Sequence, residues 1–93
     1  MINKVVLTKR IQKELLIVPT YIAIKLKAWV LDVETRGLEE VRKIPGYHDE
    51  PLKGTRQGER SIRLSRSYRA IYEIKDNGII EFVSLKEIHK HEY

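Results

Sequence analysis

The segment between Pro19 and Gly37 constrains the fold more than any other part of this 93-residue sequence. Proline is tolerated at the start of a helix but not inside one, and glycine is preferred just beyond a helix C-terminus. Between these two residues, apolar side chains recur at helical spacing, namely Ile22, Leu26, Trp29 and Val33. The sequence therefore predicts a helix from about Thr20 to Arg36, with Trp29 packed in the core rather than exposed for stacking on a base.

A strand and a shorter helix are predicted before this segment. Residues 2–7 form a short segment rich in β-branched residues, which indicates a strand. It ends at Thr8, a possible helix cap. A helix then runs to about Val18, with Ile11, Leu15 and Val18 on one face. Pro19 separates this helix from the next.

The second half of the chain changes to β-type patterns. Residues 38–44 could add one helical turn before Pro45-Gly46, which starts a polar connection without a packing role. Strands are then predicted over residues 61–65, 68–75 and 79 to about 88, the last two joined by the hairpin signal Asn77-Gly78. In the first of these strands, Ile62 and Leu64 face one way, while Ser61, Arg63 and Ser65 form a wet face.

These elements predict a single α+β domain over residues 1–93, in which an N-terminal strand and two helices pack on one face of a small, mostly antiparallel sheet. The other face stays partly open. The longest apolar run is interrupted by Pro19 and by charged residues, so no membrane span is expected. With no cysteine and no recognisable leader, a cytoplasmic protein is expected.

The positive charge of the chain is concentrated in one segment. The formal net charge is +5, and residues 53–69 alone contain six cations and one acid, Glu59. The six are Lys53, Arg56, Arg60, Arg63, Arg66 and Arg69. This concentration indicates a phosphate-rich or acidic partner, because charge that serves only solubility has no reason to be gathered.

A basic helix would also explain the spacing of these cations, but Gly54, Gly58 and three serines argue against it. In the strand interpretation, Arg63 and Arg69 lie on the open face, with Lys53 and Arg56 in the loop beside it. Arginine suits phosphate, because its fork matches phosphate oxygens two at a time. No Gly-Lys-Ser/Thr ending follows the glycines, so nucleotide hydrolysis is not expected.

The C-terminal residues offer further chemical groups. His89 and His91 are two residues apart and hence lie on the same side of an extended chain, where they could act as acid and base or bind a metal. A metal site is disfavoured, because only His48 remains as another histidine ligand. We expect neither a metal nor a cofactor.

Several motifs together carry a resemblance to a known family. They are Glu50-Pro51-Leu52-Lys53-Gly54, Arg60-Ser61-Ile62-Arg63, Ser67-Tyr68-Arg69-Ala70-Ile71-Tyr72 and the ending His91-Glu92-Tyr93. The combination resembles toxins of the RelE/ParE superfamily, especially HigB-, RelE- and YoeB-like ribosome-dependent mRNA endonucleases. The resemblance is strongest over residues 45–93, and the helical half agrees in the order of its elements.

The resemblance implies the toxin of a type II toxin–antitoxin system, which inhibits translation by cleaving mRNA through attack of a 2′-hydroxyl on the adjacent phosphate. The base in relatives is a carboxylate that matches Glu50 or a lysine that matches Lys53, and both stay open here. Arg69 matches the arginine that stabilises the transition state, and His91 or Tyr93 matches the acid or the platform for a base. Predicted RNA contacts are Arg56, Arg63, Arg66 and Lys90.

The tail departs from the family pattern, because Glu92 stands before Tyr93 where several relatives have histidine or aspartate. Which tail group acts as the acid is therefore open. The family also implies a cognate antitoxin as partner, besides mRNA on the ribosome, and an exposed sheet edge could pair with a second copy. Two other functions remain possible from the sequence: a ParE-like inhibitor of gyrase and a non-catalytic RNA- or DNA-binding domain.

Overall fold

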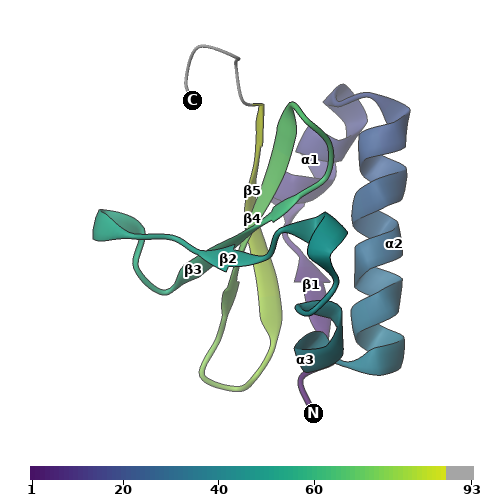
Figure 1. Ribbon diagram of the computed structural model, residues 1–93. Coiled ribbons are helices and arrows are strands. Elements are labelled where there is room, and N and C mark those ends of the chain that lie inside the picture. The colour runs from purple at the N-terminus through teal and green to yellow at the C-terminus, as the bar shows by residue number, and fades with distance from the viewer. Residues whose placement is uncertain (88–93) are drawn as a thin grey trace.

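The computed structural model describes residues 1–87, except for the side chain of Arg56. Its elements are β1 (Val5–Leu7), α1 (Lys9–Ile17), α2 (Thr20–Arg36), α3 (Leu38–Val41), η1 (Pro45–Tyr47), β2 (Glu50–Pro51), η2 (Gly54–Arg56), β3 (Glu59–Arg63), β4 (Tyr68–Ile74) and β5 (Ile80–Glu87), where η denotes a 3₁₀ helix. The strands of the described residues form one sheet in the order β1-β5-β4-β3-β2. β1 runs parallel to β5, and all other neighbours are antiparallel. Figure 1 shows α1 and α2 on one side of this sheet, which confirms the predicted α+β class.

The helices begin and end close to the predicted positions. The hydroxyl of Thr8 caps α1 by accepting a hydrogen bond from the amide of Ile11 at 3.3 Å. α2 has the predicted bounds and is followed by Gly37, whose φ of +87° is a conformation that favours glycine. The next amide, of Leu38, donates to the carbonyl of Ile2 at 2.7 Å. The turn after α2 therefore ties the start of the chain to the helical layer.

The apolar stripe of α2 forms the centre of the core, as predicted. Ile22, Leu26, Trp29 and Val33 are all fully buried. The ring of Trp29 packs against Tyr72 of β4 and Phe82 of β5, with ring centroids 5.3 and 5.2 Å apart. Such tilted and edge-to-face pairs add to the stability gained by burying aromatic area. Trp29 thus joins α2 to the two central strands.

The polar segment after η1 is more ordered than the sequence predicts. Glu50 and Pro51 form a short edge strand paired with Ser61 and Arg60 of β3. The carboxylate of Asp49 is fully buried and accepts hydrogen bonds from Arg60 Nε at 2.6 Å and from the Tyr72 hydroxyl at 2.5 Å. The prediction that this segment has no packing role is therefore wrong, because the partners of Asp49 lie far along the chain and no local pattern indicates them.

The strands that follow differ in detail from the prediction. β3 covers residues 59–63 rather than 61–65, so Leu64 and Ser65 belong to the turn that leads to β4. The predicted hairpin joins β4 to β5, and its Asn77 side chain accepts a hydrogen bond from the amide of Ile79. Within this pair the register shifts: Tyr72 pairs with Phe82, but Ile71 pairs with Ser84. One extra residue, Val83, therefore forms a β-bulge in β5.

The edges of the sheet are short. β1 has three residues, and β2 has two, one of them Pro51. Short edge strands and edge prolines both oppose pairing of one sheet with another. The predicted homodimer stays a prediction. Within residues 1–87, no helix is long and apolar enough to cross a membrane.

Candidate active site

The sheet face opposite the helices brings several of the predicted residues together. Glu50 of β2 pairs with Ser61 of β3, Ser61 pairs with Ile71 of β4, and Ile71 pairs with Ser84 of β5. Residues paired in this way project from the same face of a sheet. We call this surface, on the side away from α1 and α2, the open face. It is less exposed to solvent than predicted, because Ser61 is only 2% exposed.

A guanidinium and a carboxylate contact each other at the centre of the open face. Arg69 Nη1 lies 3.3 Å from Glu50 Oε1 and 3.2 Å from the hydroxyl of Ser61. The Glu50 side chain is 54% exposed, and that of Arg69 is 22% exposed. An arginine has five N–H donors, of which these contacts use those on a single nitrogen. The pair is therefore held in place but can still reach a bound phosphate.

Two residues along the strands from Ser61 and Ile71, three cations lie side by side on the open face. Arg63 of β3 pairs with Arg69 of β4, and Arg69 pairs with Lys86 of β5. The sequence prediction named both arginines but missed Lys86. Counting from the hairpin turn without a bulge would place Leu85 opposite Arg69, and only the extra residue at Val83 brings Lys86 there. We call Arg63, Arg69 and Lys86 the cationic row.

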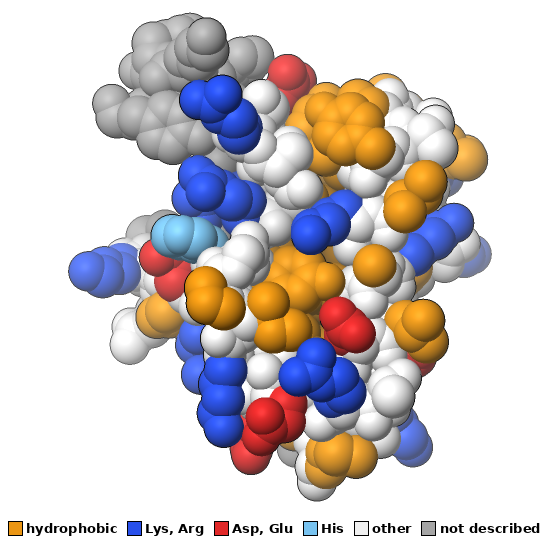
Figure 2. All heavy atoms as spheres, turned by 45° about the vertical axis from the view of Figure 1, so that its right-hand side comes forward, with side chains coloured by type: hydrophobic (Ala, Val, Ile, Leu, Met, Phe, Trp, Pro, Cys, Tyr) orange, Lys and Arg blue, Asp and Glu red, His pale blue; other side chains and the backbone are white. Residues whose placement is uncertain are grey.

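The other predicted site residues lie around this face or outside the described part. Lys53 is exposed at the start of η2, and Arg66 is exposed in the turn between β3 and β4. Arg56 belongs to η2, but its side chain is outside the described part of the structure. Lys90, His91 and Tyr93 also lie outside the described residues, so their roles remain predictions. Figure 2 shows Lys and Arg side chains gathered along the left of the molecule.

Glu50 is positioned by the buried residue that precedes it. Asp49 bonds to Arg60 and Tyr72, which belong to neighbouring strands, and Glu50 then enters the sheet opposite Ser61. Burial, followed by the hydrogen bond and charge of Asp49, raises the pKa of Tyr72 far above its usual value. Tyr72 therefore stays protonated and keeps donating to Asp49, which fixes the entry of β2.

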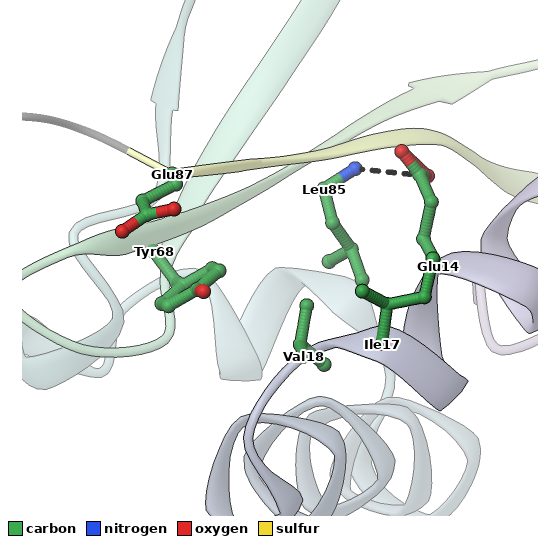
Figure 3. A pocket seen from close by; sticks show the side chains of 6 residues that line it. All are labelled: Glu14, Ile17, Val18, Tyr68, Leu85 and Glu87. Atoms are coloured by element: carbon green, nitrogen blue, oxygen red, sulfur yellow. Dashed lines mark hydrogen bonds between the residues drawn. The ribbon is translucent and has the colours of Figure 1, made fainter.

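A second, apolar surface lies where α1 ends and α2 begins. Leu16 and Ile17 of α1 are 87% and 83% exposed, and Tyr21 and Ile24 of α2 are 60% and 61% exposed. Figure 2 shows hydrophobic side chains gathered in this upper region. A pocket of about 220 Å³ adjoins it, lined by Glu14, Ile17, Val18, Tyr68, Leu85 and Glu87 (Figure 3). Exposed apolar side chains gathered in this way are typical of a protein-binding surface.

The described residues offer little to a metal ion. Within residues 1–87, no three His, Asp or Glu side chains come together in a group that could hold one. At the centre of the open face, the described side chains supply the carboxylate of Glu50, the hydroxyl of Ser61 and the guanidinium of Arg69.

Comparison with known proteins gives matches at the level of structure. No protein-family model matches the sequence, and no curated protein is similar to it in sequence. Among solved structures, YafQ from E. coli superimposes with a TM-score of 0.71 at 17% identity, covering 91% of this chain and 92% of YafQ. A chain of the archaeal RelE–RelB complex from Pyrococcus horikoshii gives a TM-score of 0.72 at 22% identity, covering 97% of this chain and 99% of that chain.

A third match is the YoeB–YefM complex from Staphylococcus aureus, with a TM-score of 0.67 at 17% identity, covering 92% of this chain and 97% of the other. Each alignment spans nearly the whole of both chains, so the likeness is not limited to one motif. The predicted resemblance is therefore confirmed in three dimensions: this chain has the fold of the RelE, YoeB and YafQ toxins.

Proposed function

We propose that this protein is the toxin of a type II toxin–antitoxin system and that it cleaves mRNA on the ribosome. The observation that carries the proposal is the contact between Glu50 and Arg69 on the open face, beside Arg63 and Lys86. The fold supports it, because the solved structures with this fold include named toxins and toxin–antitoxin complexes.

The chemistry needs a base, positive charge and an acid. A base removes the proton of a ribose 2′-hydroxyl, whose oxygen then bonds to the adjacent phosphorus while the bond from phosphorus to the 5′-oxygen breaks. The products are a 2′,3′-cyclic phosphate and a 5′-hydroxyl, so the leaving oxygen must receive a proton. No metal or cofactor takes part in the proposed reaction.

We assign the base to Glu50 and the stabilising charge to Arg69. The two side chains touch, so a phosphate bound by the free N–H groups of Arg69 would lie within reach of the carboxylate of Glu50. Arg69 can then stabilise the extra charge on the phosphorane oxygens, where preorganised donors contribute most. Lys53 is the alternative base, and His91 or Tyr93 is proposed as the acid or as a stacking platform.

The cognate antitoxin is proposed to bind the apolar surface formed by α1 and α2. Leu16, Ile17 and Tyr21 are costly to leave in water, and the pocket of Figure 3 can receive an apolar side chain. A partner helix that presents apolar side chains to this surface would bury them.

Expression in a bacterial host without the antitoxin tests the proposal. The wild-type chain should arrest growth and translation, and Arg69→Ala should abolish the arrest. Arrest without loss of translation would point instead to a gyrase inhibitor of the ParE kind, and full toxicity of Arg69→Ala would overturn the role of Arg69.

A further inference from the structure

Lys86 occupies a position that folding alone does not explain. Its register places it beside Arg69, which in turn lies beside Arg63, so three cations project from neighbouring strands. Like charges directly opposite each other destabilise a sheet. Of the three, Arg69 has Glu50 as its partner, whereas Arg63 and Lys86 have no ion-pair partner among residues 1–87. Within the described part of the chain, Arg63 and Lys86 can therefore each bind an anion such as a phosphate.

The opposite end of the open face carries the opposite charge. Glu59 of β3 pairs with Glu73 of β4, and Glu73 pairs with Glu81 of β5. This acidic row lies four residues along β4 from the cationic row, which is a distance of about 13 Å at the rise of a β-strand. One of its members, Glu73, also contacts Lys75 at 2.6 Å. The open face is therefore positively charged at one end of its strands and negatively charged at the other.

This difference in charge along the strands favours one orientation of a bound nucleic-acid backbone over another. Neighbouring strands are about 4.8 Å apart, so the cationic row extends about 10 Å across the sheet. An RNA strand that ran along the β-strands would bring its phosphates over the acidic row. A strand that crosses them at the cationic end meets Arg63, Arg69 and Lys86 in turn and avoids the glutamates.

We propose that Lys86 binds an RNA phosphate, so that the backbone crosses the β-strands along the cationic row, and that the acidic row marks the limit of the binding surface. The proposal rests on the proposed function, since it concerns the RNA that this protein would cleave. Lys86 is exposed on β5, and its contact would be a positional one that carries no base specificity.

RNA binding by the full chain tests the proposal. The probe is a short single-stranded RNA with a 2′-O-methyl ribose at each position, which prevents cleavage, and binding is followed by fluorescence anisotropy at several salt concentrations. Lys86→Gln should weaken binding about three- to tenfold at low salt, and the slope of log K against log salt should fall by about 0.7. Lys86→Arg, which keeps the positive charge, should bind with the affinity and the salt slope of the wild-type protein.

Lys27→Gln is the matched control, because Lys27 is exposed on α2 and its loss changes the net charge equally. It should leave the salt slope unchanged. If wild-type protein binds the probe but Lys86→Gln binds with the same affinity and slope, Lys86 is not a phosphate contact and the inference alone fails. If wild-type protein does not bind the probe, the phosphate contact proposed for Lys86 also fails, whereas cleavage on the ribosome is tested separately by mapping RNA ends in cells.

The acidic row has its own readout in the same assay. Glu81→Gln should tighten binding by about twofold through reduced repulsion, and a weaker or equal affinity would contradict its role as a boundary. A thermal melt of each variant separates these effects from folding. Removing the charge of Lys86 should leave the melting temperature unchanged or slightly raised, because like-charge repulsion in the sheet is relieved.

Discussion

Arg69 reaches from β4 past Ser61 of β3 to the carboxylate of Glu50 on β2. Two separate strand pairings therefore set the distance between the proposed base and the proposed stabilising charge. Catalytic groups held by a sheet are more closely fixed than groups held by loops alone.

Loss of the Arg69 guanidinium should remove catalysis but not the fold. We expect Arg69→Ala to lower the rate of mRNA cleavage on ribosomes by about 10²- to 10³-fold, the usual effect of removing one preorganised donor. Arg36→Ala, at the exposed end of α2, is the matched control and should cleave at the wild-type rate. Equal rates for the two variants would contradict the assignment.

The identity of the base can be read from the pH dependence of cleavage. If Glu50 accepts the proton, Glu50→Gln should remove the acidic limb of the profile, whereas Lys53→Met should keep its shape. The measurement is the single-turnover cleavage rate of each variant across pH. The reverse pattern would transfer the role to Lys53.

Removal of the buried carboxylate should destabilise the protein. Asp49→Ala leaves Arg60 and the Tyr72 hydroxyl without their partner, and we expect the free energy of unfolding to fall by about 3 kcal/mol. Glu34→Ala, on the exposed side of α2, should change it by less than about 0.5 kcal/mol. Urea denaturation of both variants is the measurement, and a small effect at Asp49 would show that the site does not depend on this anchor.

Tyr72 should make the protein sensitive to alkali. Its pKa is raised in the folded state by burial and by Asp49, while in the unfolded chain it lies near 10. Above about pH 10 the unfolded state loses this proton and the folded state keeps it, so stability falls by up to about 1.4 kcal/mol per pH unit. Tyr72→Phe should show a shallower decline above pH 10 in denaturation experiments. Parallel curves for the two proteins would contradict a raised pKa.

Local patterns predicted the helical layer well. Pro19 and Gly37 mark the two ends of α2 through their own backbone conformations, which do not depend on distant residues. The buried stripe centred on Trp29 follows from helical spacing. The burial of Asp49 could not be predicted, since its partners lie 11 and 23 residues away. Arg60 and Tyr72 come close to Asp49 only through the pairing of β3 with β4.

The site was predictable only in part for the same reason. Alternation along β3, together with the motifs around Glu50 and Arg69, places residues on the open face, and the sheet pairing confirms that Glu50, Arg63 and Arg69 share it. Lys86 was missed, because a single bulge at Val83 shifts the register and a bulge leaves no clear pattern in the sequence.

The proposed cleavage of translated mRNA by this protein is tested most directly by mapping RNA ends in cells. After brief expression of the wild-type chain, we predict new 5′-hydroxyl ends within translated codons, and none in cells that express Arg69→Ala at the same level. An absence of new ends during growth arrest, or equal cutting by both proteins, would contradict the claim.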